Sequence, residues 1–462
     1  MMMLIPAGLL VMGAGLALTA RGNTAIERAT LGSALGLLAS LVLALAAALG
    51  QIPGEGLVVT LMVLTSFVAT IALAFSSRYM RADRNPQRFA VTVALLAASV
   101  LLAVAAEDAL TLALGWLASG QLLASLIGHV DGWAEAKTAE RRARRAFIIG
   151  DAALLVALAV LAMHAGSIEL KAMLSAEISF EPVVLIMVAA LFLVAAMARS
   201  ALPPFDGWLI GSMTAPTPVS ALMHAGLVNA GGFLLIRFAP VMEAAPLVQI
   251  AAVIAGIIAA LWGTGIALVR PDIKRSLAGS TVAQMGFMIL SCGMGAYAAA
   301  LWHLVAHGLF KAWLFLRSGS AIGGQTDTAM RKLDGTTLAA ISAVVIGVGV
   351  TLVSMGRSEA ALLPLLLATA TGLATALGTM RAKTGRWVQL LGFVVVLIVA
   401  HTAGLTLIGA GMAHAEGVSP VAGAIALFAA LPFLGVWVWQ SLRGNALPPT
   451  LYVRLLNAGV AA

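Results

Sequence analysis

Residues 300–316 read ALWHLVAHGLFKAWLFL, a continuous apolar run that contains two histidines and one lysine. Apolar runs of about 20 residues recur along the chain, and each is long enough to cross a hydrocarbon core of about 30 Å. Backbone polar groups inside lipid must be hydrogen-bonded within the protein, so runs of this kind must be helices. Of the 462 residues, 61% are hydrophobic and only 10% are charged. These features predict an all-α polytopic membrane protein.

The hydropathy pattern predicts about 14 to 15 transmembrane helices. Met1–Ala20 is apolar and lacks a charged N-terminal region, so we expect it to be the first span and not a cleaved signal. We place the expected spans at residues 3–20, 28–50, 57–77, 89–106, 109–128, 146–164, 182–200, 218–238, 245–268, 277–295, 297–318, 336–355, 359–380, 387–411 and 421–441.

The distribution of Lys and Arg predicts the orientation of these spans. If the N-terminus lies outside, the loops after odd-numbered spans face the cytoplasm, and the outer loops keep little basic charge beyond Lys171 and Arg237. An excess of Lys and Arg on the cytoplasmic side orients membrane proteins. We therefore expect a multi-pass protein of the bacterial inner membrane with its C-terminus in the cytoplasm. The cytoplasmic loops would hold Arg21, Arg28, Arg78, Arg81, Arg84, Arg88, Lys137, Arg141, Arg142, Arg144, Arg145, Arg270, Lys274, Arg275, Arg331, Lys332, Arg381, Lys383 and Arg386.

Composition also excludes several kinds of site. The net charge of +8 is an orientation signal with some attraction to anionic membrane lipid. The basic loops lack the aromatic platforms that bind single strands, so we expect no nucleic-acid partner. The single cysteine, Cys292, excludes an intramolecular disulfide and Cys-rich metal sites. We expect no metal and no cofactor, and a transporter instead of an enzyme.

The densest group of ionisable residues inside a span is His303, His307 and Lys311. Their spacing of four residues stacks all three side chains on one helical face, each about 6 Å along the axis from the next. Histidine titrates near neutrality, so this stack is able to pass a proton. Two packed histidines bonded to backbone carbonyls beside a snorkelling lysine are the alternative interpretation. Metal binding by the histidine pair is disfavoured, because no third ligand or HExxH glutamate lies nearby.

A second polar group surrounds the end of the span at 182–200. Arg199 is followed by Pro203 and Pro204, and paired prolines interrupt a helix and free its carbonyls. Interrupted helices in membrane proteins line ion paths. Asp151 lies about one turn inside its span. It either pairs with Arg145 as a solvated cap or faces inward as the counter-ion of Arg199.

Three further residues are candidates for the same path. His224 follows Ala215-Pro216-Thr217-Pro218, which repeats the proline interruption. Lys274 lies in PDIKRSLAGS, residues 271–280, where a topogenic role is equally consistent with the sequence. Gly356-Arg357-Ser358 before Pro364 echoes Ala198-Arg199-Ser200 before Pro203, which makes Arg357 a candidate charge of a second repeat.

Three long segments carry a resemblance to a known family. They are ARSALPPFDGWLIGSMTAPTPVSALMHAGLVNAGGFLLIR (198–237), PDIKRSLAGSTVAQMGFMIL (271–290) and HLVAHGLFKAWLFLRSGSAI (303–322). They resemble the antiporter-like membrane subunits, which comprise the large proton-pumping subunits of complex I, multisubunit Na⁺/H⁺ antiporter subunits and the DabB branch.

The resemblance implies two inverted five-helix repeats with interrupted helices, joined by a polar axis at mid-membrane. We expect N-terminal helices at 1–88, the repeats at 89–240 and 241–380, and C-terminal helices at 381–462. The family's ion-translocating positions correspond to Asp151, Arg199, His224, Lys274, His303, His307 and Lys311.

The sequence departs from the family pattern at several places. Leu117 follows Gly115-Trp116, where the fifth helix of the family carries a glutamate. Arg199 replaces a lysine, and an arginine holds a fixed charge because it does not release its proton. For the pumping lysine of the second repeat, Arg357 is the nearest counterpart. We also expect the long lateral helix of the complex I subunit to be missing.

These departures favour the DabB branch, the membrane subunits of energy-coupled inorganic-carbon uptake. The resemblance then implies conduction of H⁺ or Na⁺ that energises a large peripheral zinc-binding subunit of the DabA kind. A redox-driven proton pump, a cation/proton antiporter subunit and a purely structural scaffold remain alternatives.

Overall fold

The computed structural model describes residues 2–52, 55–175, 181–321, 399, 403–404, 408–409, 411–412 and 448–458. Within these ranges the chain is helical and has no β-strand beyond an isolated bridge between Asp108 and Glu169. Nine described helical segments are long and apolar enough to cross a membrane, with the interrupted segment Thr217–Arg237 counted as one. The expectation of an all-α, multi-pass membrane protein is therefore confirmed.

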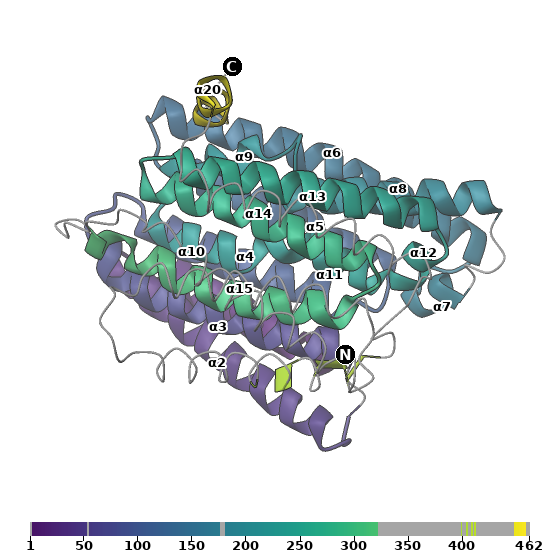
Figure 1. Ribbon diagram of the computed structural model, residues 1–462. Helices are drawn as coiled ribbons and strands as arrows, with labels where there is room; N and C mark the ends of the chain where they lie inside the picture. The colour runs from purple at the N-terminus through teal and green to yellow at the C-terminus, as the bar shows by residue number, and fades with distance from the viewer. Residues whose placement is uncertain are drawn as a thin grey trace.

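The described helices form a bundle in which most lie side by side (Figure 1). In Figure 1, α15 lies between α3 and α14, and it contacts both. The bounds are α1 Ile5–Leu18, α2 Asn23–Ala48, α3 Gly56–Tyr79, α4 Pro86–Val104, α5 Ala109–Ile127, α6 Ala134–Ala165, α7 Leu170–Ser175, α8 Pro182–Arg199, α9 Gly207–Ile210, α10 Thr217–Ala225, α11 Ala230–Arg237, α12 Ala239–Glu243, α13 Pro246–Val269, α14 Ile273–Gly293, α15 Tyr297–Arg317 and α20 Pro449–Asn457, with 3₁₀ turns at η1 Met2–Leu4, η3 Ser212–Thr214, η4 Leu227–Asn229 and η5 Ser318–Ala321.

Each expected span from 3–20 to 297–318 contains a helix, and the later spans lie wholly or largely outside the described residues. One boundary differs clearly, because α6 begins at Ala134 and not at residue 146. Its added turns are held by ion pairs along the helix surface. The Glu140 carboxylate lies 3.2 Å from the Lys137 amine and 2.8 Å from the Arg144 guanidinium. Pairs at these spacings stabilise helices, so the basic segment is helical instead of a loop.

Close backbone contact holds α13 against α14. A Cβ atom at Gly263 would lie 2.3 Å from the backbone nitrogen of Ala283, and one at Gly286 would lie 2.6 Å from the backbone nitrogen of Ala260. Small residues let transmembrane helices approach this closely, and the packing gained stabilises their association. α14 also contacts α15, and it carries Lys274 and Thr281.

Two helices are interrupted, the first at the paired prolines as predicted and the second at residues 226–229, beyond Pro216 and Pro218, which instead mark the start of α10. α8 ends at Arg199 and the chain resumes a helix only at Gly207, after the paired prolines. The Trp208 indole donates to the Ala198 carbonyl at 3.1 Å and so satisfies one group that the break frees. The second interruption separates α10 from α11 and contains η4.

The two interruptions lie against each other. The Ser200 hydroxyl, just after α8, donates to the Val228 carbonyl in η4 at 2.6 Å. The Asn229 amide donates to the Ala225 carbonyl, at the end of α10, at 2.8 Å. Irregular backbone at membrane depth is tolerated where protein covers it. The Ser200–Val228 bond joins the two breaks, and the bonds from Trp208 and Asn229 satisfy carbonyls within each break.

Candidate functional site

Arg199 and Asp151 form a buried ion pair. Nη2 of Arg199 lies 2.9 Å from Oδ1 of Asp151, and the two residues are 2% and 6% exposed. The Trp116 indole donates to the same oxygen at 3.0 Å. Arg145 is exposed. Of the two interpretations of Asp151, the structure therefore shows the inward one.

Aromatic rings and a glycine enclose the guanidinium. Its carbon lies 4.6 Å from the Trp116 ring centroid and 4.9 Å from that of Phe147. Cation–π contacts of this kind strengthen when water is excluded. A Cβ atom at Gly120 would lie 2.7 Å from Nη1 of Arg199, so only glycine leaves the side chain its room. Leu117 packs at the edge of the apolar core.

The three polar residues of α15 lie on one face, as their spacing predicts. The rings of His303 and His307 are 5.7 Å apart between centroids and nearly parallel, at 19°. His307 and Lys311 are buried, whereas His303 is half-buried. Lys311 is only 2% exposed, so it does not snorkel toward solvent. Its amine donates to the Leu277 carbonyl at 3.0 Å and also contacts the Ser280 hydroxyl.

His224 joins this group through α14. Its Nδ1 atom lies 3.0 Å from the Thr281 hydroxyl, which donates to the Leu277 carbonyl at 2.9 Å. Because that hydroxyl has one proton and gives it to Leu277, its oxygen accepts from Nδ1–H of His224. The His224 ring also stacks on Phe315 of α15, with centroids 4.2 Å apart. The result is one network that runs from His224 through Thr281 and the Leu277 carbonyl to Lys311.

Lys274 lies one helical turn from Leu277, at the start of α14. Its amine donates to the Ala215 carbonyl at 3.1 Å and lies 3.5 Å from that of Met213. Both carbonyls lie just before α10, where Pro216 prevents a regular helix. Carbonyls that have no partner within a helix need another donor. The Lys274 amine supplies one, and it thereby ties the start of α14 to the segment before α10.

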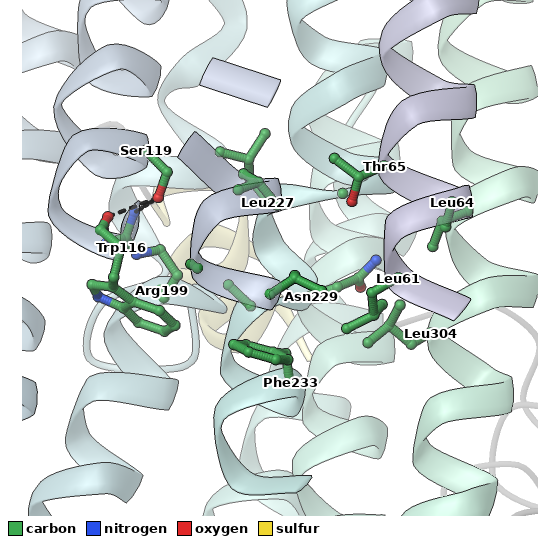
Figure 2. A pocket seen from close by; sticks show the side chains of 15 residues that line it. Leu61, Leu64, Thr65, Trp116, Ser119, Arg199, Leu227, Asn229, Phe233 and Leu304 are labelled. Carbon is green, nitrogen blue, oxygen red and sulfur yellow. Dashed lines mark hydrogen bonds between the residues drawn. The ribbon is translucent and has the colours of Figure 1, made fainter. Parts of the chain in front are cut away.

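The sequence-predicted residues therefore form two clusters. Arg199 and Asp151 lie together among α5, α6 and α8, and the other five lie among α10, α14 and α15. A cavity of about 40 Å³ adjoins the first cluster (Figure 2), and its lining includes Arg199 on one side and Leu304 of α15 on the other. Arg357 lies outside the described residues.

Sequence reasoning missed several residues that shape these clusters. Trp116, Phe147 and Gly120 enclose Arg199, and Thr281 connects His224 to α14. A buried arginine requires acceptors and aromatic faces, but nothing in the sequence says which helices supply them. Among the described residues no group of three or more His, Cys, Asp or Glu side chains is arranged to hold a metal ion.

Comparison with known proteins gives relatives of two functional kinds. The chain is 42% identical over 266 residues to the probable inorganic carbon transporter subunit DabB1 of Halothiobacillus neapolitanus, a match to 55% of this chain and 47% of that protein. It is 37% identical over 279 residues to NADH-quinone oxidoreductase subunit L of Mycobacterium tuberculosis, with 59% and 44% covered. The chain thus spans about half the length of these curated relatives.

A solved structure shares the fold. The Mrp complex from Dietzia sp. DQ12-45-1b matches with a TM-score of 0.62 and 24% identity over 99% of this chain and 52% of that one. The family model described as NADH:quinone oxidoreductase/Mrp antiporter, TM, matches residues 106–356, which is more than half of the chain and contains both clusters. This chain belongs to the NADH:quinone oxidoreductase/Mrp antiporter transmembrane family.

Proposed function

We propose that this chain conducts H⁺, or Na⁺, through the buried polar clusters and so energises uptake of inorganic carbon. The observation that carries the proposal is the hydrogen-bonded network from His224 through Thr281 and the Leu277 carbonyl to Lys311, next to His307. Ionisable groups inside a membrane are costly and mark ion pathways. The identity of 37–42% to proteins named as probable DabB subunits favours carbon uptake as the process that the ion flow drives.

The proposed path begins on the cytoplasmic side at Lys274 and continues through Lys311, His307 and His303. An amine and two imidazoles in succession exchange protons between neutral and charged forms, and each transfer spans about one helical turn. His224 would bridge this path to the first repeat. The orientation with the N-terminus outside, the repeats at 89–240 and 241–380, and a charge role for Arg357 belong to the same proposal.

Arg199 and Asp151 have a different role in this scheme. The guanidinium keeps its proton, so the pair is a fixed dipole and not a carrier. Trp116 and Phe147 pack their rings against the guanidinium, and in the protein interior charges act over longer distances than in solution. The pair would set the local field that a proton on α15 experiences.

The partner we propose is a large peripheral zinc-binding subunit of the DabA kind, which would carry the carbon chemistry. A second candidate function is ion translocation in a complex I-like pump or a cation/proton antiporter. It is favoured by the 37% identity to an NADH-quinone oxidoreductase subunit L.

Growth in air tests the proposal. Cells without high-affinity carbon uptake would express the chain alone, the large zinc-binding protein encoded beside it alone, or both. We expect growth only with both proteins, and we expect a protonophore to abolish it. Assembly of both proteins in the membrane without growth would contradict a role in carbon uptake. Ion flux in the same membranes would then support the second candidate.

A further inference from the structure

The cavity lined by Arg199 and Leu304 is large enough for water. Its volume is about 40 Å³, and one water molecule needs about 10–15 Å³ measured in this way. Polar groups line it at opposite sides, with Arg199 and Ser119 on one and Thr65 on the other (Figure 2). An apolar cavity stays dry, whereas one with several polar partners holds ordered water.

Asn229 supplies an acceptor in this cavity that lacks a partner. The residue is 2% exposed and lines the cavity between Arg199 and Thr65 (Figure 2). Its amide nitrogen donates to the Ala225 carbonyl at 2.8 Å, but its Oδ1 atom is buried without a hydrogen-bond partner among the described residues. Buried acceptors are nearly always hydrogen-bonded, to protein or to ordered water.

The guanidinium also has hydrogen-bonding capacity left. Its Nη2 atom binds Asp151 and the Trp116 carbonyl, while Nη1 reaches only the Ser119 hydroxyl at 3.4 Å. Five N–H groups are available on an arginine, so hydrogens remain for a further acceptor. A cation is excluded from this position by the positive charge, whereas a water oxygen is attracted to it.

We propose that this cavity is a water-binding site, in which Oδ1 of Asn229 and the guanidinium of Arg199 hold water between the two interrupted helices. Water in the cavity donates to Oδ1 of Asn229, with the Thr65 hydroxyl as a further partner, and the volume holds about three molecules, enough for water to extend to Arg199 on the opposite side. It joins the Arg199–Asp151 pair to the break between α10 and α11. No covalent change occurs at this site.

Leu304 bounds the water site on the side of α15. It lies one residue after His303 and one turn before His307, so its side chain separates the water from the histidines. Water screens a charge more strongly than protein does. This part of the inference rests on the proposed function. Water at the site weakens the electrostatic interaction between the charge of Arg199 and a proton carried on α15. Asn229 is a positioning residue that acts through this water.

Radiolytic footprinting of the full chain in membranes tests the site directly. X-rays convert bound water into hydroxyl radicals that oxidise the side chains beside it. Phe233 lines the cavity, and Phe192 is an equally buried ring that stacks on Phe238 away from it. We expect oxidation of Phe233 but not of Phe192, loss of that oxidation in Asn229→Leu, and its retention in Asn229→Ser. Equal protection of both rings in the unaltered protein, or no change in Asn229→Leu, would overturn the proposal.

Ion flux in the same preparations separates this inference from the function on which it rests. We expect Asn229→Leu to slow flux about tenfold, the equivalent of about one lost hydrogen bond, and Asn229→Ser to restore it. Oxidation of Phe233 in a protein without flux would reject the proposed function and keep the water site. Flux that is unchanged in Asn229→Leu would reject the role of the water in conduction. If Asn229→Leu does not assemble, the unaltered protein and Asn229→Ser still decide between a wet and a dry cavity.

Discussion

Lys311 and His224 are linked through one backbone oxygen, that of Leu277. The lysine amine donates to it directly at 3.0 Å, and His224 reaches it through the Thr281 hydroxyl, by bonds of 3.0 and 2.9 Å. Each bond in such a chain polarises the next, and a low local dielectric strengthens all of them. A change of charge on Lys311 is therefore felt at His224, on a different helix.

Thr281→Val tests this connection with almost no change in shape. The substitution removes the acceptor of the His224 Nδ1–H, and an unsatisfied buried donor costs about 1–3 kcal/mol. We expect the folded protein to conduct about tenfold more slowly in a vesicle flux assay. Thr264→Val is the matched control, because the Thr264 hydroxyl bonds only the Ala260 carbonyl of its own helix, at 2.7 Å. Equal flux in the two variants would show that the Thr281 bridge has no role.

The Arg199–Asp151 pair predicts strong non-additivity between substitutions. Asp151→Asn leaves the guanidinium charge buried without its counter-ion, and breaking a buried pair in this way costs about 3–5 kcal/mol. The double variant Asp151→Leu with Arg199→Leu removes both charges and should recover most of that loss. Thermal unfolding of the detergent-purified variants measures both effects. A double variant less stable than Asp151→Asn would contradict the pairing.

Gly120→Ala tests the fit around the guanidinium. The added methyl would lie 2.7 Å from Nη1 of Arg199, so the arginine must move, and overpacking of this kind costs about 1–3 kcal/mol. We expect an assembled protein with a lower melting temperature and reduced flux. Gly8→Ala on α1 is the control, because nothing lies within 4 Å of its added methyl. A melting temperature in Gly120→Ala equal to that of Gly8→Ala would refute the tight fit.

Gly286→Leu should separate α13 from α14. The new side chain would meet the backbone of Ala260 and Gly256, each 2.6 Å from the position of its Cβ. Because α14 carries Lys274 and Thr281, we expect loss of assembly in size-exclusion chromatography, while Gly15→Leu, with open space around it, assembles normally. Normal assembly of Gly286→Leu would mean that the close helix contact is dispensable.

Spacing along one helix was enough to predict the face of α15. His303, His307 and Lys311 repeat every four residues, and the structure places the two rings 5.7 Å apart. The paired prolines likewise predicted the break after α8, because Pro lacks the donor that a helix needs. The break between α10 and α11 was not predicted: it lies at residues 226–229, which contain no proline, whereas Pro216 and Pro218 mark the start of α10. The start of α6 was missed, since hydropathy marks where a helix enters lipid and not where it begins.

The sequence alone did not predict which helices far apart in the chain contact one another. Asp151 had two candidate partners, and only the packing of α6 against α8 selects Arg199 over Arg145. The rings of Trp116 and Phe147 come from two further positions on α5 and α6. Apolar periodicity in a membrane protein is weak, because lipid-facing and core-facing residues are both hydrophobic, so it does not fix how each helix is rotated.

Flux through membrane vesicles with an imposed pH gradient is the measurement that tests the proposed path most directly. The variants are Lys311→Ala and His307→Ala in the full chain with its partner, and the controls are Lys171→Ala and His164→Ala, which alter the same residue types at exposed positions. We predict that both path variants assemble and lose proton flux, while both controls conduct like the unaltered protein. Flux that is intact in both path variants would contradict the assignment of this line of residues.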